Sequence, residues 1–96
     1  MMSIWKYRIP IESMIIVNSD SIGEFTILMP RGSRTLCVQI QGDAPHIWTR
    51  VDTEAELEPH SFTLVGTGHK CDGTIFMQYI GTFQMASGNL VFHLFE

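Results

Sequence analysis

The sequence predicts a mainly β domain, a small antiparallel β-sandwich or barrel-like fold of about seven short strands with at most one short helix. Short apolar runs recur at intervals of roughly ten residues, and turn formers such as Gly, Pro, Asn and Asp separate them. No stretch keeps an apolar spacing of about 3.6 residues over several turns, as a long amphipathic helix would. A chain of 96 residues is expected to form a single β-rich domain over residues 1–96.

The first expected strand covers residues 4–9, where side chains alternate between two faces until Pro10 ends the ladder. Residues 11–23 are less regular, with a possible short strand at 14–17 followed by loop residues. The next strand, residues 24–28, leads into a turn at 29–32 in which Pro30 is expected at the first central position.

Residues 34–41 give the clearest alternation in the chain. Leu36, Val38 and Ile40 are expected on one face and Cys37, Gln39 and Gln41 on the other. A turn at residues 42–45 precedes a returning strand at 46–51.

The middle of the chain combines an acidic connection with a further strand. Residues 52–59 are polar and are expected to form a surface connection, and a short helix would fit either at 52–58 or at 11–23. A strand at residues 60–65 then ends in a glycine-rich run, and residues 70–73 form the next loop.

Residues 78–95, near the end of the chain, have the pattern of a β-hairpin with its loop at 85–89. The second arm, residues 90–95, is apolar on both faces apart from His93, so both faces are expected to be covered. A second copy of the chain would cover Val91 and Phe95, which predicts a homo-oligomer; the competing interpretation is that the domain's own loops cover this face.

Charge and cysteine content exclude several classes. With six Lys and Arg against ten Asp and Glu, the net charge is −4, which disfavours duplex nucleic acid but not a small anionic ligand in a local basic pocket. Neither a secretory leader nor an apolar run long enough to span a membrane is visible. We therefore expect a cytoplasmic protein without membrane partners, in which Cys37 and Cys71 are reduced.

The sequence also resembles a family of short proteins encoded by bacteriophages and prophages and carried as a domain of unknown function. The resemblance covers nearly the whole chain, and residues 14–23 look like an insertion relative to the family. The motifs that carry it are WKY at 5–7, MPRG at 29–32, VQIQ at 38–41, PHIW at 45–48, VD at 51–52, GTGH at 66–69, YIGTFQ at 79–84 and GNLVFHLFE at 88–96. It implies a phage origin and a location in the bacterial host cytoplasm. It assigns no catalytic residue.

The glycine-rich run Gly66, Thr67, Gly68 and His69 is the most site-like stretch. Two glycines allow backbone conformations that expose N–H groups to a ligand, and Thr67 and His69 would add side-chain hydrogen bonds. The alternative is a strand end or bulge that packing requires.

Aromatic and basic residues on the predicted strands suggest a second feature. Trp48 and Arg50 are two residues apart and therefore share a strand face, where a flat ring could stack while a cation meets a phosphate. Trp5, Arg34 and Lys70 are candidates for the same roles. The alternative is that the aromatic rings belong to the core.

The four histidines lack the spacing of a metal site, so no metal and no cofactor is expected. No motif for nucleophilic catalysis is present, and the chain is not expected to be an enzyme.

These residues and the phage resemblance favour a binding protein. The hypothesis is a host-defence antagonist that sequesters a cyclic nucleotide immune signal where subunits meet. The alternative is a structural or assembly component of the virion, or a direct binder of a host protein.

Overall fold

The computed structural model describes residues 1–13, 15–16 and 22–96, and most of these residues lie in strands. Seven of the strands have six to ten residues, while β2 has two. In chain order the elements are β1 (Met2–Arg8), the 3₁₀ helix η1 (Ile11–Ser13), β2 (Ile15–Ile16), β3 (Ile22–Pro30), β4 (Arg34–Gln41), β5 (Ala44–Asp52), β6 (Leu57–Gly66), η2 (Asp72–Thr74), β7 (Tyr79–Met85), η3 (Ala86–Gly88) and β8 (Leu90–Phe95).

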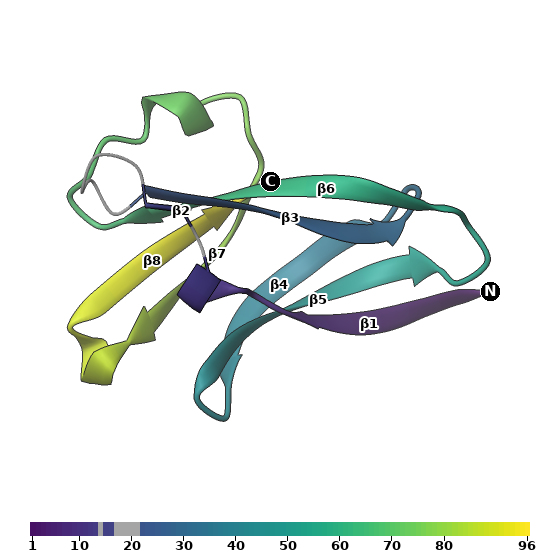
Figure 1. Cartoon of the computed structure of the whole chain (residues 1–96), viewed down its shortest axis with the longest axis horizontal. Helices are drawn as coiled ribbons and strands as arrows, with labels where there is room; N and C mark the ends of the chain where they lie inside the picture. The colour runs from purple at the N-terminus through teal and green to yellow at the C-terminus, as the bar shows by residue number, and fades with distance from the viewer. Residues whose placement is uncertain (14, 17–21) are drawn as a thin grey trace.

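The strands form two antiparallel sheets, ordered β1-β5-β4 and β2-β3-β6-β8-β7 (Figure 1). They pack face to face around one hydrophobic core, so the predicted β-sandwich is confirmed. The expected hairpins are present as β4–β5 and β7–β8. The pairing of β1 with β5 and of β6 with β8 joins segments that are distant in sequence.

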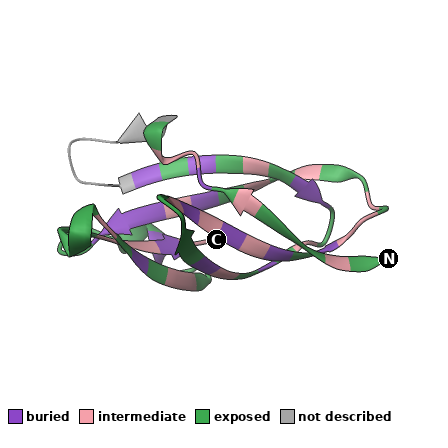
Figure 2. Ribbon diagram, turned by 90° about the horizontal axis from the view of Figure 1, so that it is seen from below, coloured by how far each residue is buried: buried purple, intermediate pink, exposed green. Residues whose placement is uncertain are grey.

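The core lies between the inner faces of the two sheets, and Figure 2 shows buried residues alternating with exposed ones along the strands. Phe25 and Phe62 stack within this core with ring centroids 5.1 Å apart. Burial of each large apolar side chain contributes about 1.5–3 kcal/mol. The core cluster comprises Ile9, Phe25, Met29, Val38, Ile47, Phe62, Leu64, Phe83 and Leu94.

The two sheets approach most closely where β7 faces β4. A Cβ added to Gly81 would lie 2.7 Å from Cγ1 of Val38, far inside normal contact distance. Glycine at this position therefore allows the two sheets to meet along this side.

Two local predictions were wrong. A β-bulge between Thr35 and Cys37 breaks the alternation of β4, so Leu36 is 43% exposed instead of sharing the inner face with Val38. Pro30 is the last residue of β3, and Ser33 N–H donates to its carbonyl oxygen, so it begins the turn instead of occupying the first central position.

Other boundaries differ by a few residues. The strand β6 begins at Leu57, so the acidic connection is shorter than the predicted 52–59. The backbone of Ile15–Ile16 pairs with β3, while residues 14 and 17 of the predicted 14–17 strand lie outside the described residues. The described helices are single 3₁₀ turns, and no helix in the described part of the chain has the length and apolar character to traverse a bilayer.

Candidate functional site

Basic side chains gather on the outer face of the three-stranded sheet. Ile47, Thr49 and Val51 of the central strand β5 are buried, so the alternate residues face outward. Directly paired residues share a face, and the register therefore fixes which residues lie side by side on the outward face. The rows that carry basic residues are Ile4–Arg50–Arg34, Lys6–Trp48–Cys37 and Arg8–His46–Gln39, and Met2–Asp52 forms a further outward row. Four of the six Lys and Arg residues of the chain thus lie on this surface, which we call the basic face.

Arg34 and Arg50 are directly opposite each other on β4 and β5. Both are exposed, and neither forms an ion pair with any described residue. Like charges at directly paired positions are destabilising because their Cβ atoms are only about 5 Å apart. An anion bound between the two guanidinium groups would remove that repulsion.

Aromatic rings lie beside this arginine pair. Trp48 is half-buried on β5, and its ring centroid is 6.1 Å from that of His46, with the planes tilted by 51°. The Lys6 ammonium donates a 2.6 Å hydrogen bond to Gln41 Oε1, which reaches across the central strand from β1 to β4. The basic face therefore offers the Trp48 ring for stacking and the Lys6 ammonium as a further cation.

One edge of the basic face is neutralised internally. Arg8 donates a 2.6 Å hydrogen bond to Glu12, and this hydrogen bond is the main reason that the pKa of Glu12 is lowered. Arg8 is therefore less available to a ligand than Arg34, Arg50 or Lys6.

The structure divides the sequence-predicted site residues into separate groups. It brings Arg34, Trp48 and Arg50 together on the basic face. Trp5 pairs with Thr49, which places it on the opposite face of the same sheet, where it is 38% exposed. The glycine-rich run 66–69 and Lys70 follow β6 in the other sheet.

Sequence reasoning missed Lys6, Arg8 and His46 as members of the basic face. The alternation of β1 places Lys6 and Arg8 on one side, and that signal was visible in the sequence. What was missing is the pairing of β1 with β5, which sets them beside Trp48.

The glycine-rich run lines a second feature, a cavity of about 220 Å³ on the outer face of the five-stranded sheet. We call it the loop cavity; its walls are Val65, Gly66, Thr67, Gly68, His69, Cys71, His93 and Phe95. The N–H groups of Thr67 and His69 donate to the carbonyl oxygens of Val91 and Gly66, at 3.0 and 3.2 Å. These two donors are thus already used inside the chain, contrary to the expectation that the run presents its N–H groups to a ligand.

Hydroxyl groups hold His93 on both sides. Its Nε2 is 2.7 Å from Thr67 Oγ1, and its Nδ1 is 2.8 Å from Thr82 Oγ1. The Tyr79 hydroxyl lies 2.6 Å from Thr82 Oγ1 and extends this series of hydrogen bonds. His93 is therefore a fixed wall of the loop cavity, and a metal ion could bind it only after displacing a hydroxyl.

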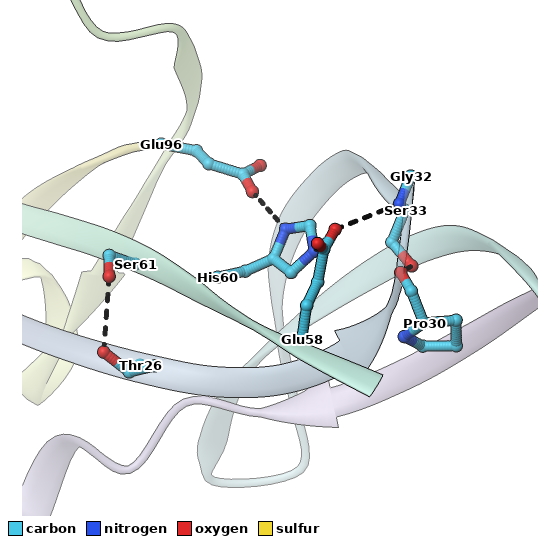
Figure 3. Close-up of polar contacts among 8 residues, drawn as sticks. All are labelled: Thr26, Pro30, Gly32, Ser33, Glu58, His60, Ser61 and Glu96. Carbon is cyan, nitrogen blue, oxygen red and sulfur yellow. Dashed lines mark hydrogen bonds and ion pairs between the residues drawn. The ribbon is translucent and has the colours of Figure 1, made fainter. Parts of the chain in front are cut away.

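A third polar cluster surrounds His60 (Figure 3). Its Nδ1 is 3.0 Å from Glu96 Oε2 and its Nε2 is 3.2 Å from Glu58 Oε1, which also accepts the Gly32 N–H at 3.1 Å. The backbone of Glu96 exchanges hydrogen bonds with Gln78 at 2.7 and 2.9 Å. We interpret this cluster as a structural clasp that ties the end of β8 to the β3–β4 turn.

Within the described residues, no group of three or more His, Cys, Asp or Glu side chains is arranged to hold a metal ion. Cys37 and Cys71 are both free thiols.

Comparison with known proteins identifies the family but no individual relative. No curated protein and no solved structure matches the chain. A family model, Domain of unknown function (DUF7352), matches residues 1–96. The chain therefore belongs to the DUF7352 family.

Proposed function

We propose that this protein binds a nucleotide on its basic face. The observation that carries the proposal is the directly opposed, unpaired Arg34–Arg50 pair next to Trp48, in a chain whose net charge is −4. In such an acidic chain, an exposed pair of like cations on one sheet face is best explained by an anionic ligand.

The chemistry of the face matches the parts of a nucleotide. Guanidinium groups bind phosphate oxygens through paired N–H donors, so Arg34 and Arg50 would hold a phosphate between them. The Trp48 indole would stack on the base, a contact worth roughly 1–3 kcal/mol. Lys6 would exchange its hydrogen bond with Gln41 for a second phosphate contact.

The biological role we propose is capture without turnover. The resemblance to phage and prophage proteins suggests that the ligand is a cyclic di- or trinucleotide immune signal of the bacterial host, which the protein withdraws. In this proposal the ligand lies on an open sheet face within one subunit, and not between subunits as the sequence suggested.

Calorimetric titration with cyclic dinucleotides, cyclic trinucleotides and linear mononucleotides tests binding. We expect heat release and a rise in melting temperature with at least one cyclic nucleotide, because ligand binding to the folded state stabilises it. Chromatography after long incubation should recover that ligand unchanged. Absence of heat and of any melting shift with every nucleotide would refute the proposal.

Charge-removing variants locate the site. Arg34→Gln and Arg50→Gln should each weaken binding about tenfold or more, as expected for loss of a charge-assisted contact of roughly 1.5–3 kcal/mol. Arg31→Gln is the matched control, since Arg31 lies outside the basic face and pairs with Glu56 at 3.3 Å. Equal effects at Arg31 and Arg34 would place the ligand elsewhere.

A further inference from the structure

An apolar tip projects from the loop between β6 and β7. Directly after η2, Ile75 is 72% exposed and Phe76 is 96% exposed. Loop tips in water usually carry small or polar residues, and a bare Phe beside a bare Ile forgoes about 1.5–3 kcal/mol of burial for each side chain. This tip therefore indicates a partner surface with an apolar recess.

Local hydrogen bonds hold the backbone next to the tip in a defined conformation. Thr74 is buried, and its hydroxyl donates a 2.7 Å hydrogen bond to the Cys71 carbonyl oxygen. The backbone N–H of Met77 donates to the Thr74 carbonyl oxygen at 2.9 Å. A preorganised tip loses little conformational entropy on docking, which favours its use as an anchor.

The loop cavity is a recess of the required kind on the same loop. It measures about 220 Å³, and Val65, Gly68, Cys71 and Phe95 contribute mostly apolar surface to it. For comparison, an apolar cavity of roughly 150 Å³ accommodates benzene. Phe76 does not fill the cavity of its own chain, because its side chain is almost wholly in solvent.

We propose that two copies of the chain associate through this face, with Phe76 of each copy seated in the loop cavity of the other. A knob and a recess carried by one loop make the surface self-complementary, as a two-fold interface requires. The docked ring would contact Phe95, whose own ring packs edge-on against Tyr79 at 5.7 Å. The loop thus supplies both the partial cover of β8 within one chain and the contact between chains.

This association is separate from the proposed nucleotide binding. The basic face is the outer face of the three-stranded sheet, whereas the loop cavity lies on the outer face of the other sheet, on the opposite side of the sandwich. A dimer formed this way leaves both basic faces accessible, so either proposal can fail while the other holds.

Light scattering coupled to size exclusion tests the interface over a range of micromolar concentrations. We expect the wild-type protein to have the mass of two chains and Phe76→Ser to have the mass of one. Leu57→Ser is the control, because Leu57 is 61% exposed and lies at the end of β6 remote from the loop cavity. Circular dichroism should show the same sheet content in all three proteins, since neither side chain belongs to the core.

A complementary variant tests the recess. Cys71→Trp should fill the loop cavity and give a single-chain mass while leaving Phe76 in place. Mixed with Phe76→Ser, it should form a heterodimer weaker than the wild-type dimer, because one of the two knob-and-recess contacts is restored. A wild-type protein of single-chain mass, or a Phe76→Ser protein that stays dimeric, would overturn the proposal.

Discussion

Two threonine hydroxyls on the inner face of the three-stranded sheet are buried without compensation. Thr35 and Thr49 are directly opposite each other on β4 and β5, and their Oγ1 atoms have no hydrogen-bond partner in the described part of the chain. A buried unsatisfied polar group costs about 1–3 kcal/mol. These two hydroxyls therefore make the three-stranded sheet, which carries the basic face on its other side, less stable than it would be with apolar side chains at both positions.

Thr49→Val should therefore stabilise the protein. Valine keeps the branched shape and removes the unpaired hydroxyl, and we expect the free energy of unfolding to rise by about 1 kcal/mol in urea titrations. Thr26→Val is the control, because the Thr26 hydroxyl is exposed and lies 3.4 Å from Ser61 Oγ. A loss of stability in Thr49→Val alone would show that its hydroxyl is satisfied in solution.

Gly81 is fixed by the close approach of the two sheets. Gly81→Ala would bring a Cβ to 2.7 Å from Val38 Cγ1, and because Val38 is itself packed in the core, the sheets must move apart. We expect a loss of about 1–3 kcal/mol in unfolding free energy, the usual cost of overpacking. Gly73→Ala is the matched control, since nothing lies within 4 Å of its added Cβ. Equal stability losses in the two variants would contradict this account.

At the scale of whole elements, strand positions were largely readable from the sequence, whereas strand pairing was not. Alternation marked β4 and β5, and the spacing of Trp48 and Arg50 placed both on one face. The bulge at Leu36 left no signal, because an inserted residue in an apolar strand still looks like alternation until its partner strand is known.

The same limit applied to the candidate site. Lys6 belongs to the basic face only because β1 pairs with β5, more than forty positions along the chain, and periodicity is local. The glycine-rich run and Trp48 were grouped by residue type, but they lie on opposite outer faces of the sandwich. Residue type singled out Arg34, Trp48 and Arg50 as candidates, but it did not show that the pairing of β4 with β5 brings them onto one surface.

The clasp around His60 makes a prediction for β8. His60→Phe keeps a ring of similar size but leaves Glu58 and Glu96 without their shared partner. We expect the free energy of unfolding to fall by about 1–3 kcal/mol. Hydrogen exchange should become faster at the backbone amides of Gln78 and Glu96, each of which donates to the carbonyl oxygen of the other residue. Ser61→Ala, a neighbouring exposed change, should leave exchange at these amides unaltered. Unchanged exchange in His60→Phe would show that the backbone pairing alone holds the strand end.

For the whole molecule, charge is distributed unevenly. The chain has a net charge of −4, yet four of its six basic residues lie on one face of one sheet. Such separation raises the local concentration of anions beside a chain that repels them on average. Binding to the basic face should therefore weaken as ionic strength rises, since exposed charges are screened over about 10 Å in 0.1 M salt.

Two groups with shifted pKa values should contribute to the pH dependence of the free energy of unfolding. The backbone N–H of Glu54 donates to Asp52 Oδ1, and this bond, with the N-terminal ammonium 3.4 Å away, lowers the Asp52 pKa from its ordinary value of 3.8. Burial raises the pKa of Tyr7 above its ordinary value of 10.0.

The signs follow from proton linkage. As pH falls through 3.8, the unfolded chain takes up a proton at Asp52 before the folded chain does. The contribution of Asp52 to the free energy of unfolding is therefore complete above that pH, and it is lost as pH falls through the lower pKa of Asp52 in the folded chain. As pH rises past 10.0, the unfolded chain releases the Tyr7 proton before the folded chain does. The contribution of Tyr7 to the free energy of unfolding is therefore complete below 10.0, and it is lost as pH rises through the higher pKa of Tyr7 in the folded chain.

A separate variant tests the contribution of each group, and each variant serves as the control for the other. In melting scans across pH, Asp52→Asn should flatten the decline of melting temperature below about pH 4 and leave the alkaline side unchanged. Tyr7→Phe should flatten the decline above about pH 10 and leave the acid side unchanged. If the melting temperature of Asp52→Asn declined in acid as steeply as that of the wild type, the decline would belong to other carboxylates, of which Glu12 is the first candidate because its pKa is also lowered.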